Sequence, residues 1–222
     1  MNYAELVKRV NYVSYFKPEA LAVSSKNMGT IQNQLTQWQK KGKIHKLKRG
    51  IYTLNQDERR APLPPILISN ILYTPSYVSL ESALAYFTLI PEGVHQVMAV
   101  STRKTQQFRN TYGVFYYHHI KSALFFGYTS IRMQDAPILI AHPEKAILDR
   151  MYFDSVFRAE VDYFLENLRL QNLERLSSTR LLEYSRRFPS ELLRKGAKIL
   201  ADLIREEKTD ARHPGKKSKK LS

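Results

Sequence analysis

Residues 28–41 read MGTIQNQLTQWQKK and residues 42–54 read GKIHKLKRGIYTL, and these adjoining stretches decide the fold of the N-terminal part of the chain. In the first, Ile31, Leu35 and Trp38 recur at the i, i+4 and i+7 spacing of one helix face. In the second, apolar and polar side chains alternate with a period close to two. The pattern predicts a helix followed by a basic β-hairpin.

Glycines are expected to punctuate this stretch. Gly42 stands where the helix should stop, and Gly50 supplies the backbone angle of the hairpin tip. A helix over 3–15 and a short helix over Pro18–Val23 are expected upstream, the second opened by a proline beside an acid. Residues 1–60 are therefore predicted to form a winged helix-turn-helix domain.

Long amides and lysines gather on the polar face of the predicted helix and along the hairpin, and they suit DNA base edges and phosphates. For base edges or nearby phosphates the prediction is Thr30, Asn33, Gln34, Gln37 and Lys41. For the phosphate backbone it is Lys46, Lys48 and Arg49, and Lys26 and Lys43 are predicted as further DNA-binding residues. The alternative is that any small module has a polar helix face and a basic loop.

The net charge of +15 is unevenly distributed along the chain. Residues 1–60 carry 12 basic and 4 acidic side chains, a net charge of +8, and residues 208–222 carry a net charge of +5. Residues 61–150 have a net charge of +2, and residues 151–207 are neutral. A basic end on a nearly neutral body is typical of a nucleic-acid-binding protein.

A second domain is expected after a proline-rich linker, with the boundary near residue 60 and a mixed α/β domain over 61–207. Its predicted helices are 66–72, 79–87, 143–152 and a wholly helical part from about 159, and its predicted strands are 96–101, 113–118, 128–133 and 136–141. The fold class is thus α/β (α+β). Residues 208–222 are expected to be a disordered basic tail.

The cysteine content and the length of the apolar stretches indicate a cellular compartment and exclude cysteine-based sites. The 222 residues contain no cysteine, which excludes disulfides and cysteine-ligated zinc. There is no uninterrupted apolar stretch long enough to span a membrane, and the first ten residues lack the order of a signal peptide. A cytoplasmic protein that does not bind membranes is expected.

Several segments together resemble the AbiEi antitoxins of type IV (abortive-infection) toxin–antitoxin systems. Residues 42–52, the GKIHKLKRGIY hairpin, are similar to the wing of that family. Residues 77–84, YVSLESAL, resemble the start of its second domain, and residues 141–149, AHPEKAILD, resemble a later helix start. Ile90-Pro91-Glu92, Val100-Ser101-Thr102-Arg103 and the run 113–127 fall between them in the expected order.

This resemblance implies a protein with two activities. The winged-helix domain of the family represses its own operon by binding inverted repeats in double-stranded DNA. The second domain is expected to counter a toxin with a nucleotidyltransferase fold without needing a stable complex with it. A stand-alone winged-helix transcriptional regulator with a ligand- or partner-binding second domain is the alternative.

An enzyme is not expected. The polar candidates are Glu81, His118, His119, His142, Glu144 and Asp149. Neighbouring histidines on a strand point to opposite faces and cannot readily share a metal, and an acid at a helix start suits the helix dipole. No phosphate-binding loop or zinc helix motif occurs, so the sequence predicts no catalytic residue, cofactor or metal.

The aromatic side chains of the predicted sheet could line a ligand pocket in the alternative regulator. They are Phe115, Tyr116, Tyr117, Phe125, Phe126 and Tyr128. At alternating strand positions such residues are more often core, so both interpretations stay open.

Overall fold

The N-terminal module, residues 1–60, consists of helices and one hairpin. In the computed structural model, which describes residues 1–21, 28–91, 93, 96–133 and 136–212, its elements are α1 (Tyr3–Val10), the 3-10 helix η1 (Pro18–Ala20), α2 (Met28–Lys40), β1 (Ile44–Lys48) and β2 (Ile51–Leu54). The two strands pair antiparallel, with Ile44 opposite Leu54. The predicted helix and hairpin are thereby confirmed as elements.

The two helices predicted upstream are shorter than expected. α1 starts with a capping box between Asn2 and Glu5. It ends at Val10 and not at Tyr15, and Asn11 is its C-cap, with its backbone N–H donating to the Val7 carbonyl. The helix predicted to run from Pro18 is a single 3-10 turn in the part that the structure describes. Residues 22–27, which include the last two positions of the second predicted helix, lie outside the described residues.

Both predicted glycine roles are confirmed. Gly42 follows α2 with a φ of 68°, and its N–H donates to the carbonyl of Gln39 at 3.0 Å. Gly50 at the hairpin tip has a φ of 78°. Both angles lie in the left-handed region that disfavours a side chain, which is why the helix stops and the chain reverses at these positions.

The rest of the chain forms one mixed sheet with helices on both faces, so the α+β class is confirmed. The sheet order is β5-β6-β4-β3-β8-β7. Its strands are β3 (Ser76–Val78), β4 (Gln96–Ser101), β5 (Gln106–Asn110), β6 (Gly113–His119), β7 (Tyr128–Met133) and β8 (Ala136–Ala141). The pairs β3–β8 and β4–β6 are parallel, and the other three pairs are antiparallel.

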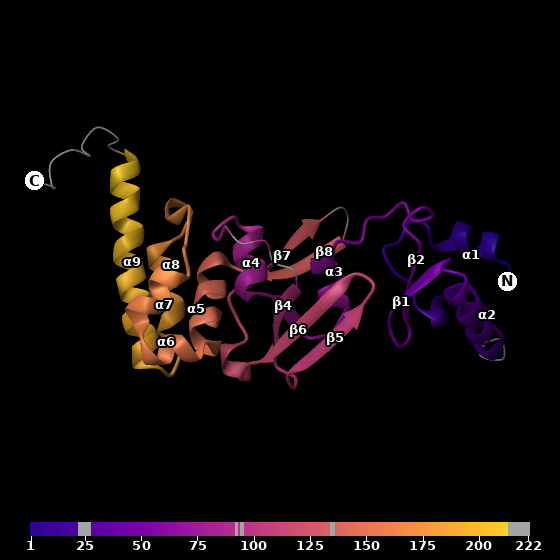
Figure 1. Ribbon diagram of the computed structural model, residues 1–222, viewed down its shortest axis with the longest axis horizontal. Helices are drawn as coiled ribbons and strands as arrows, with labels where there is room; N and C mark the ends of the chain where they lie inside the picture. The colour runs from indigo at the N-terminus through magenta and orange to yellow at the C-terminus, as the bar shows by residue number, and fades with distance from the viewer. Residues whose placement is uncertain (22–27, 92, 94–95, 134–135, 213–222) are drawn as a thin grey trace, which may run out of the picture.

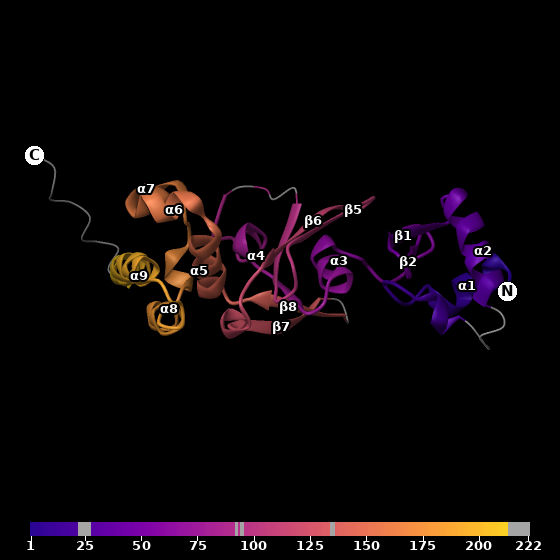
Figure 2. The ribbon, with the colours of Figure 1, turned by 90° about the horizontal axis from the view of Figure 1, so that it is seen from below.

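The sheet lies between two layers of helix. α3 (Pro65–Leu72) covers the face toward the N-terminal module, and α4 (Leu80–Tyr86) and α5 (Pro143–Phe153) cover the other face (Figure 2). Two strands differ from the prediction. β5 is polar and exposed at the sheet edge, and β3 is only three residues long, so neither has a readable alternation.

Helices continue beyond α5 to the end of the described chain. They are α6 (Ser155–Ala159), α7 (Val161–Asn167), η4 (Leu173–Arg175), α8 (Ser178–Ser185) and α9 (Glu191–Arg212), with η3 (Ser122–Leu124) earlier (Figure 1). The predicted disordered tail from residue 208 is therefore wrong for residues 208–212, which extend α9. Residues 213–222 lie outside the described part.

Two apolar cores hold the molecule together, and the hairpin contributes to both. Ile44 and Leu54, at the base of the hairpin, belong to the small core of α1, α2 and Phe16. Leu47 and Ile51, near its tip, belong to the large core of the sheet and its helices. One four-residue strand and its partner therefore join the N-terminal module to the second domain, as well as the linker does.

Candidate nucleic-acid interface

α2 presents a polar surface because its apolar side chains face the small core. Ile31 and Leu35 are buried. Thr30, Asn33 and Gln37 are exposed on the helix, and Lys41 is exposed directly after it. Four of the five predicted base-edge residues therefore remain on the surface, where amides and a lysine can reach a ligand.

Gln34 has a different environment. Its Nε2 donates to the carbonyl of Met1 at 2.7 Å, and its side chain is half-buried. Its Oε1 is buried without a partner among the described residues. The amide fastens the start of the chain against α2, so the structure does not place Gln34 with the exposed set. Lys26 lies outside the described residues.

Tyr3 links the start of the chain to the hairpin. Its ring centroid lies 5.6 Å from that of Trp38 and 4.2 Å from Lys43 Nζ, and its hydroxyl donates to the Lys43 carbonyl at 3.1 Å. Burial, with a contribution from Glu58, raises the pKa of Tyr3 to about 12. Lys43 stays exposed above the ring, as a cation held in place by a cation–π contact.

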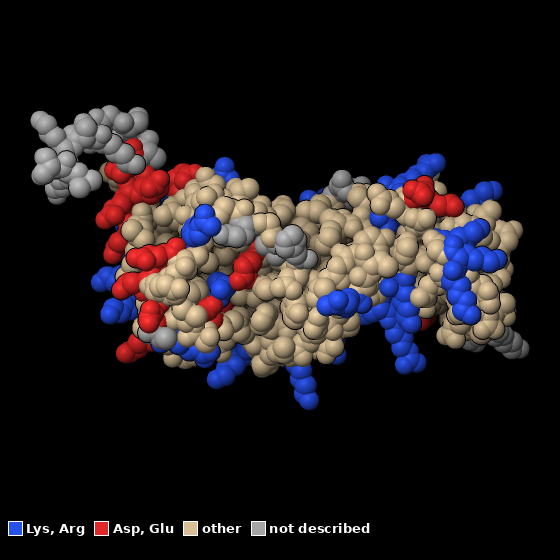
Figure 3. Space-filling view, viewed as in Figure 1, with Lys and Arg blue, Asp and Glu red and all other residues tan. Residues whose placement is uncertain are grey.

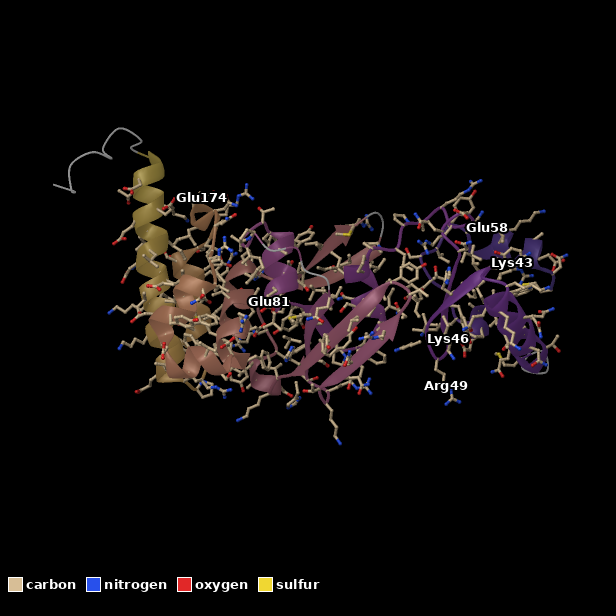
Figure 4. All side chains as sticks on the ribbon, in the orientation of Figure 1. Lys43, Lys46, Arg49, Glu58, Glu81 and Glu174 are labelled. Atoms are coloured by element: carbon tan, nitrogen blue, oxygen red, sulfur yellow. The ribbon has the colours of Figure 1, made fainter. Side chains whose placement is uncertain are left out.

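Lys46 and Arg49 are the free cations of the hairpin. Both are exposed, and Arg49 projects beyond the hairpin turn (Figure 4). A bulge between Lys46 and Lys48 shifts the strand register just before the tip. No described residue forms an ion pair with either side chain, so both charges are available to a polyanion.

Lys48, also predicted to contact phosphate, has a different environment from Lys46 and Arg49. Its Nζ donates to the carbonyl of Leu72, the last residue of α3, at 2.6 Å. Partial burial, with smaller contributions from Arg103 and Lys17, lowers the pKa of Lys48. The Lys48 ammonium thus joins the hairpin to α3 of the second domain. The neighbouring Asn110 donates to the Leu47 carbonyl at 3.2 Å.

The basic surface continues onto the second domain, which the sequence prediction did not include. Arg103, Lys104 and Arg109 are exposed on β5 and the turn before it, and β5 lies against the hairpin. Residues 28–56 and 96–133 contain no Asp or Glu at all. The absence of acids from both stretches was the sequence feature that could have predicted this larger basic surface. Lysines and arginines stand out over the N-terminal half, and acids over the C-terminal helices (Figure 3).

Of the six polar residues weighed as catalytic, Glu144 and Asp149 are buried in the fold. Lys145 and Asp149 form a fully buried ion pair. Tyr77 and Ser79 donate to Asp149 at 3.1 and 2.7 Å, and Lys145 donates to the Tyr77 hydroxyl at 2.8 Å. Burial lowers the pKa of Lys145, while Asp149 opposes that shift. The network joins α5 to β3 and offers no group to solvent.

The remaining candidates are dispersed. Glu144 is buried and accepts from the Ser177 N–H at 2.7 Å, and His142 Nδ1 lies 2.8 Å from the Tyr184 hydroxyl. Both contacts join α5 to α8. His118 and His119 belong to β6, with His118 half-buried and His119 exposed. Within the described ranges, no three His, Asp or Glu side chains gather where they could hold a metal ion.

The aromatic set weighed as a ligand pocket is mainly core packing. Phe115 and Tyr117 are fully buried, and Tyr117 donates to the Ser69 carbonyl at 2.7 Å. Phe125 and Tyr128 pack their rings on Tyr77 at 5.0 and 4.8 Å. The half-buried members Tyr116 and Phe126 complete the list. Two cavities, one beside Arg150 and one beside Tyr15, are lined by none of these six aromatic residues.

Comparisons with known proteins do not assign the chain to a family. No protein-family model matches it, and no curated protein matches it. Separately, no helix in the described part of the chain is both long and apolar enough to cross a membrane.

Proposed function

We propose that the chain is a DNA-binding regulator whose N-terminal module acts as a winged helix. The observation that carries the proposal is that α2 and the hairpin contain no Asp or Glu, and expose Asn33 and Gln37 on the helix and the unpaired cations Lys46 and Arg49 on the hairpin. Amides can read base edges in a major groove, and unpaired cations can replace the counterions of phosphates. A cytoplasmic location follows from this role.

We further propose, from the family resemblance, that it is an AbiEi-like antitoxin of a type IV system. In that role it represses its own operon and counters a nucleotidyltransferase-fold toxin. The second domain, residues 61–212, would carry the antitoxic activity, and no enzymatic step is needed for it. The support is the order of the similar segments, of which the Pro143–Asp149 stretch forms the buried helix start that joins α5 to the sheet.

A footprint on the DNA upstream of the gene, at physiological salt with competitor DNA, tests the regulator. Protection of a defined inverted repeat is expected. Uniform weak protection would instead reduce the basic surface to a general polyanion-binding one.

Growth rescue tests the antitoxin. Co-expression with the neighbouring toxin gene should restore growth, and Asn33→Ala with Arg49→Ala should lose repression without losing rescue. Absence of rescue, with full-length protein at normal level, would favour the stand-alone regulator.

A further inference from the structure

A cavity of about 540 Å³ opens on the α4–α5 side of the sheet. Ile90, Phe164 and Leu168 make a buried apolar wall, and Val156 and Tyr163 are exposed side chains at its lining. This volume is within the range of small-molecule sites, which are mostly apolar with a few placed polar groups.

One arginine organises the polar side of this cavity. Arg150 Nε lies 2.5 Å from Glu81 Oε1, an ion-pair distance without hydrogen-bond geometry, and its Nη1 donates to Asp154 Oδ2. Asp154 Oδ1 accepts from the N–H groups of Val156 and Phe157 at 2.6 and 3.0 Å. Burial opposes ionisation of Asp154, but the bonds from Arg150 and the backbone outweigh it and lower its pKa. The three charges are fixed in place, with a net charge of −1.

Polar groups with unused bonding capacity also line this cavity. Asn167 Nδ2 donates to the Tyr163 carbonyl at 2.8 Å, and no described residue pairs with its Oδ1. The Gln96 side-chain amide and Arg150 Nη2 likewise have no hydrogen-bond partner among the described residues. A ligand would therefore meet two N–H donors, from Gln96 and Arg150, and two amide oxygens, from Gln96 and Asn167.

We propose that this cavity binds an uncharged heterocycle of nucleobase or nucleoside size. Amide side chains and a guanidinium match the mixed donor and acceptor edge of a base, as they do in base recognition. The apolar wall and Tyr163 can take the ring faces. The net negative charge from Glu81, Arg150 and Asp154 disfavours a phosphate, so a nucleoside binds more tightly than its phosphorylated form. The site goes beyond DNA binding and does not depend on it.

Calorimetric titration of the full-length chain tests the site, with adenosine, guanosine, cytidine and uridine as probes and their 5′-monophosphates as competitors. At least one nucleoside is expected to bind one-to-one, with a Kd below about 1 mM. Its monophosphate is expected to bind at least about five-fold more weakly because of the net charge.

Two variants locate the binding. Asn167→Ala should weaken the best nucleoside about five-fold by removing an acceptor. Val156→Trp should abolish binding by filling the cavity from an exposed position, and Gln107→Ala on β5 is the matched control that should change nothing. Thermal melting establishes that each variant is folded.

Three results would overturn the proposal. They are saturation by none of the four nucleosides, equal affinity for nucleoside and monophosphate, and unchanged affinity in both folded cavity variants. Since no DNA is present, failure here leaves the footprint result untouched, and failure of the footprint leaves this titration untouched.

Discussion

The two ends of the molecule use basic side chains in opposite ways. In the C-terminal half, several cations are paired with acids, as in Lys145–Asp149 within the core and Arg150–Asp154 at the end of α5. In the described part of residues 1–60, no lysine or arginine forms an ion pair with a described acid, and this includes the exposed Lys46 and Arg49 of the hairpin.

The difference shows which charges serve the fold and which are free for a ligand. A buried pair contributes to stability only while both partners are present, because either partner alone is a buried charge. An exposed unpaired cation adds little to stability. Because no paired acid neutralises its charge, it can attract an anionic ligand. Mutations at the two ends should therefore separate stability from binding.

The largest effect is expected at the buried pair. Asp149→Ala should lower the free energy of unfolding by about 3–5 kcal/mol, because it leaves Lys145 charged and uncompensated in the core. Urea denaturation measures the change. Asp202→Ala is the matched control, since the Asp202–Arg205 pair is exposed and worth at most about 0.5 kcal/mol. A loss below about 1 kcal/mol for Asp149→Ala would contradict the structural role of the network.

The next effect concerns sequence reading by α2. Asn33→Ala should cost about 1–3 kcal/mol of binding at particular base pairs and leave protein stability unchanged. Competition binding with single-base operator variants measures this cost. Gln34→Ala is the comparison, because its bond to Met1 predicts a loss of stability without a change of preferred sequence. The interpretation fails if Gln34→Ala relaxes base preference and Asn33→Ala does not.

The hairpin cations offer a smaller and sharper test. Arg49→Ala and Lys46→Ala should each reduce the salt slope of DNA binding by about 0.9. Lys48→Met should leave that slope unchanged, because its ammonium bonds to Leu72. Filter binding from low to high salt measures all three slopes. A full unit of slope lost with Lys48→Met would return that lysine to the phosphate-contacting set.

The smallest effect is the pH dependence contributed by a histidine. Burial, opposed by Glu81, lowers the pKa of His118 below its usual 6.5. As pH falls below 6.5 the unfolded chain binds a proton that the folded chain resists, so stability present above that pH is lost. His118→Asn should flatten this slope. The pH dependence that remains comes from His142, because burial lowers the pKa of that side chain too. An unchanged slope would contradict the assignment, and His119→Asn is the exposed control.

Much of the fold could be predicted from the sequence, wherever periodicity was long or a glycine marked a turn. The helical spacing of Ile31 and Leu35 predicted α2, and Gly42 predicted where it ends. Elements without such a signal were missed, namely the polar edge strand β5 and the three-residue β3. The end of α9 was also missed, since its last turns contain few apolar side chains.

The sequence predicted which side chains of the candidate site would be exposed. It did not predict the contact that each side chain makes. Asn33, Gln37, Lys46 and Arg49 lie on the surface as their positions suggested. The bond from Lys48 to Leu72 could not be anticipated, because it joins positions 24 residues apart across the two domains. Helical or strand periodicity carries no information on such long-range partners.

The hairpin shared by both cores makes the N-terminal module difficult to exchange. A graft of residues 1–60 onto a foreign domain would expose Leu47 and Ile51, which here lie in the core of the sheet. Removing the second domain would do the same, creating an apolar surface that favours aggregation. Any lineage that recombined this N-terminal module with a new partner domain would therefore have to change these two side chains at the same step.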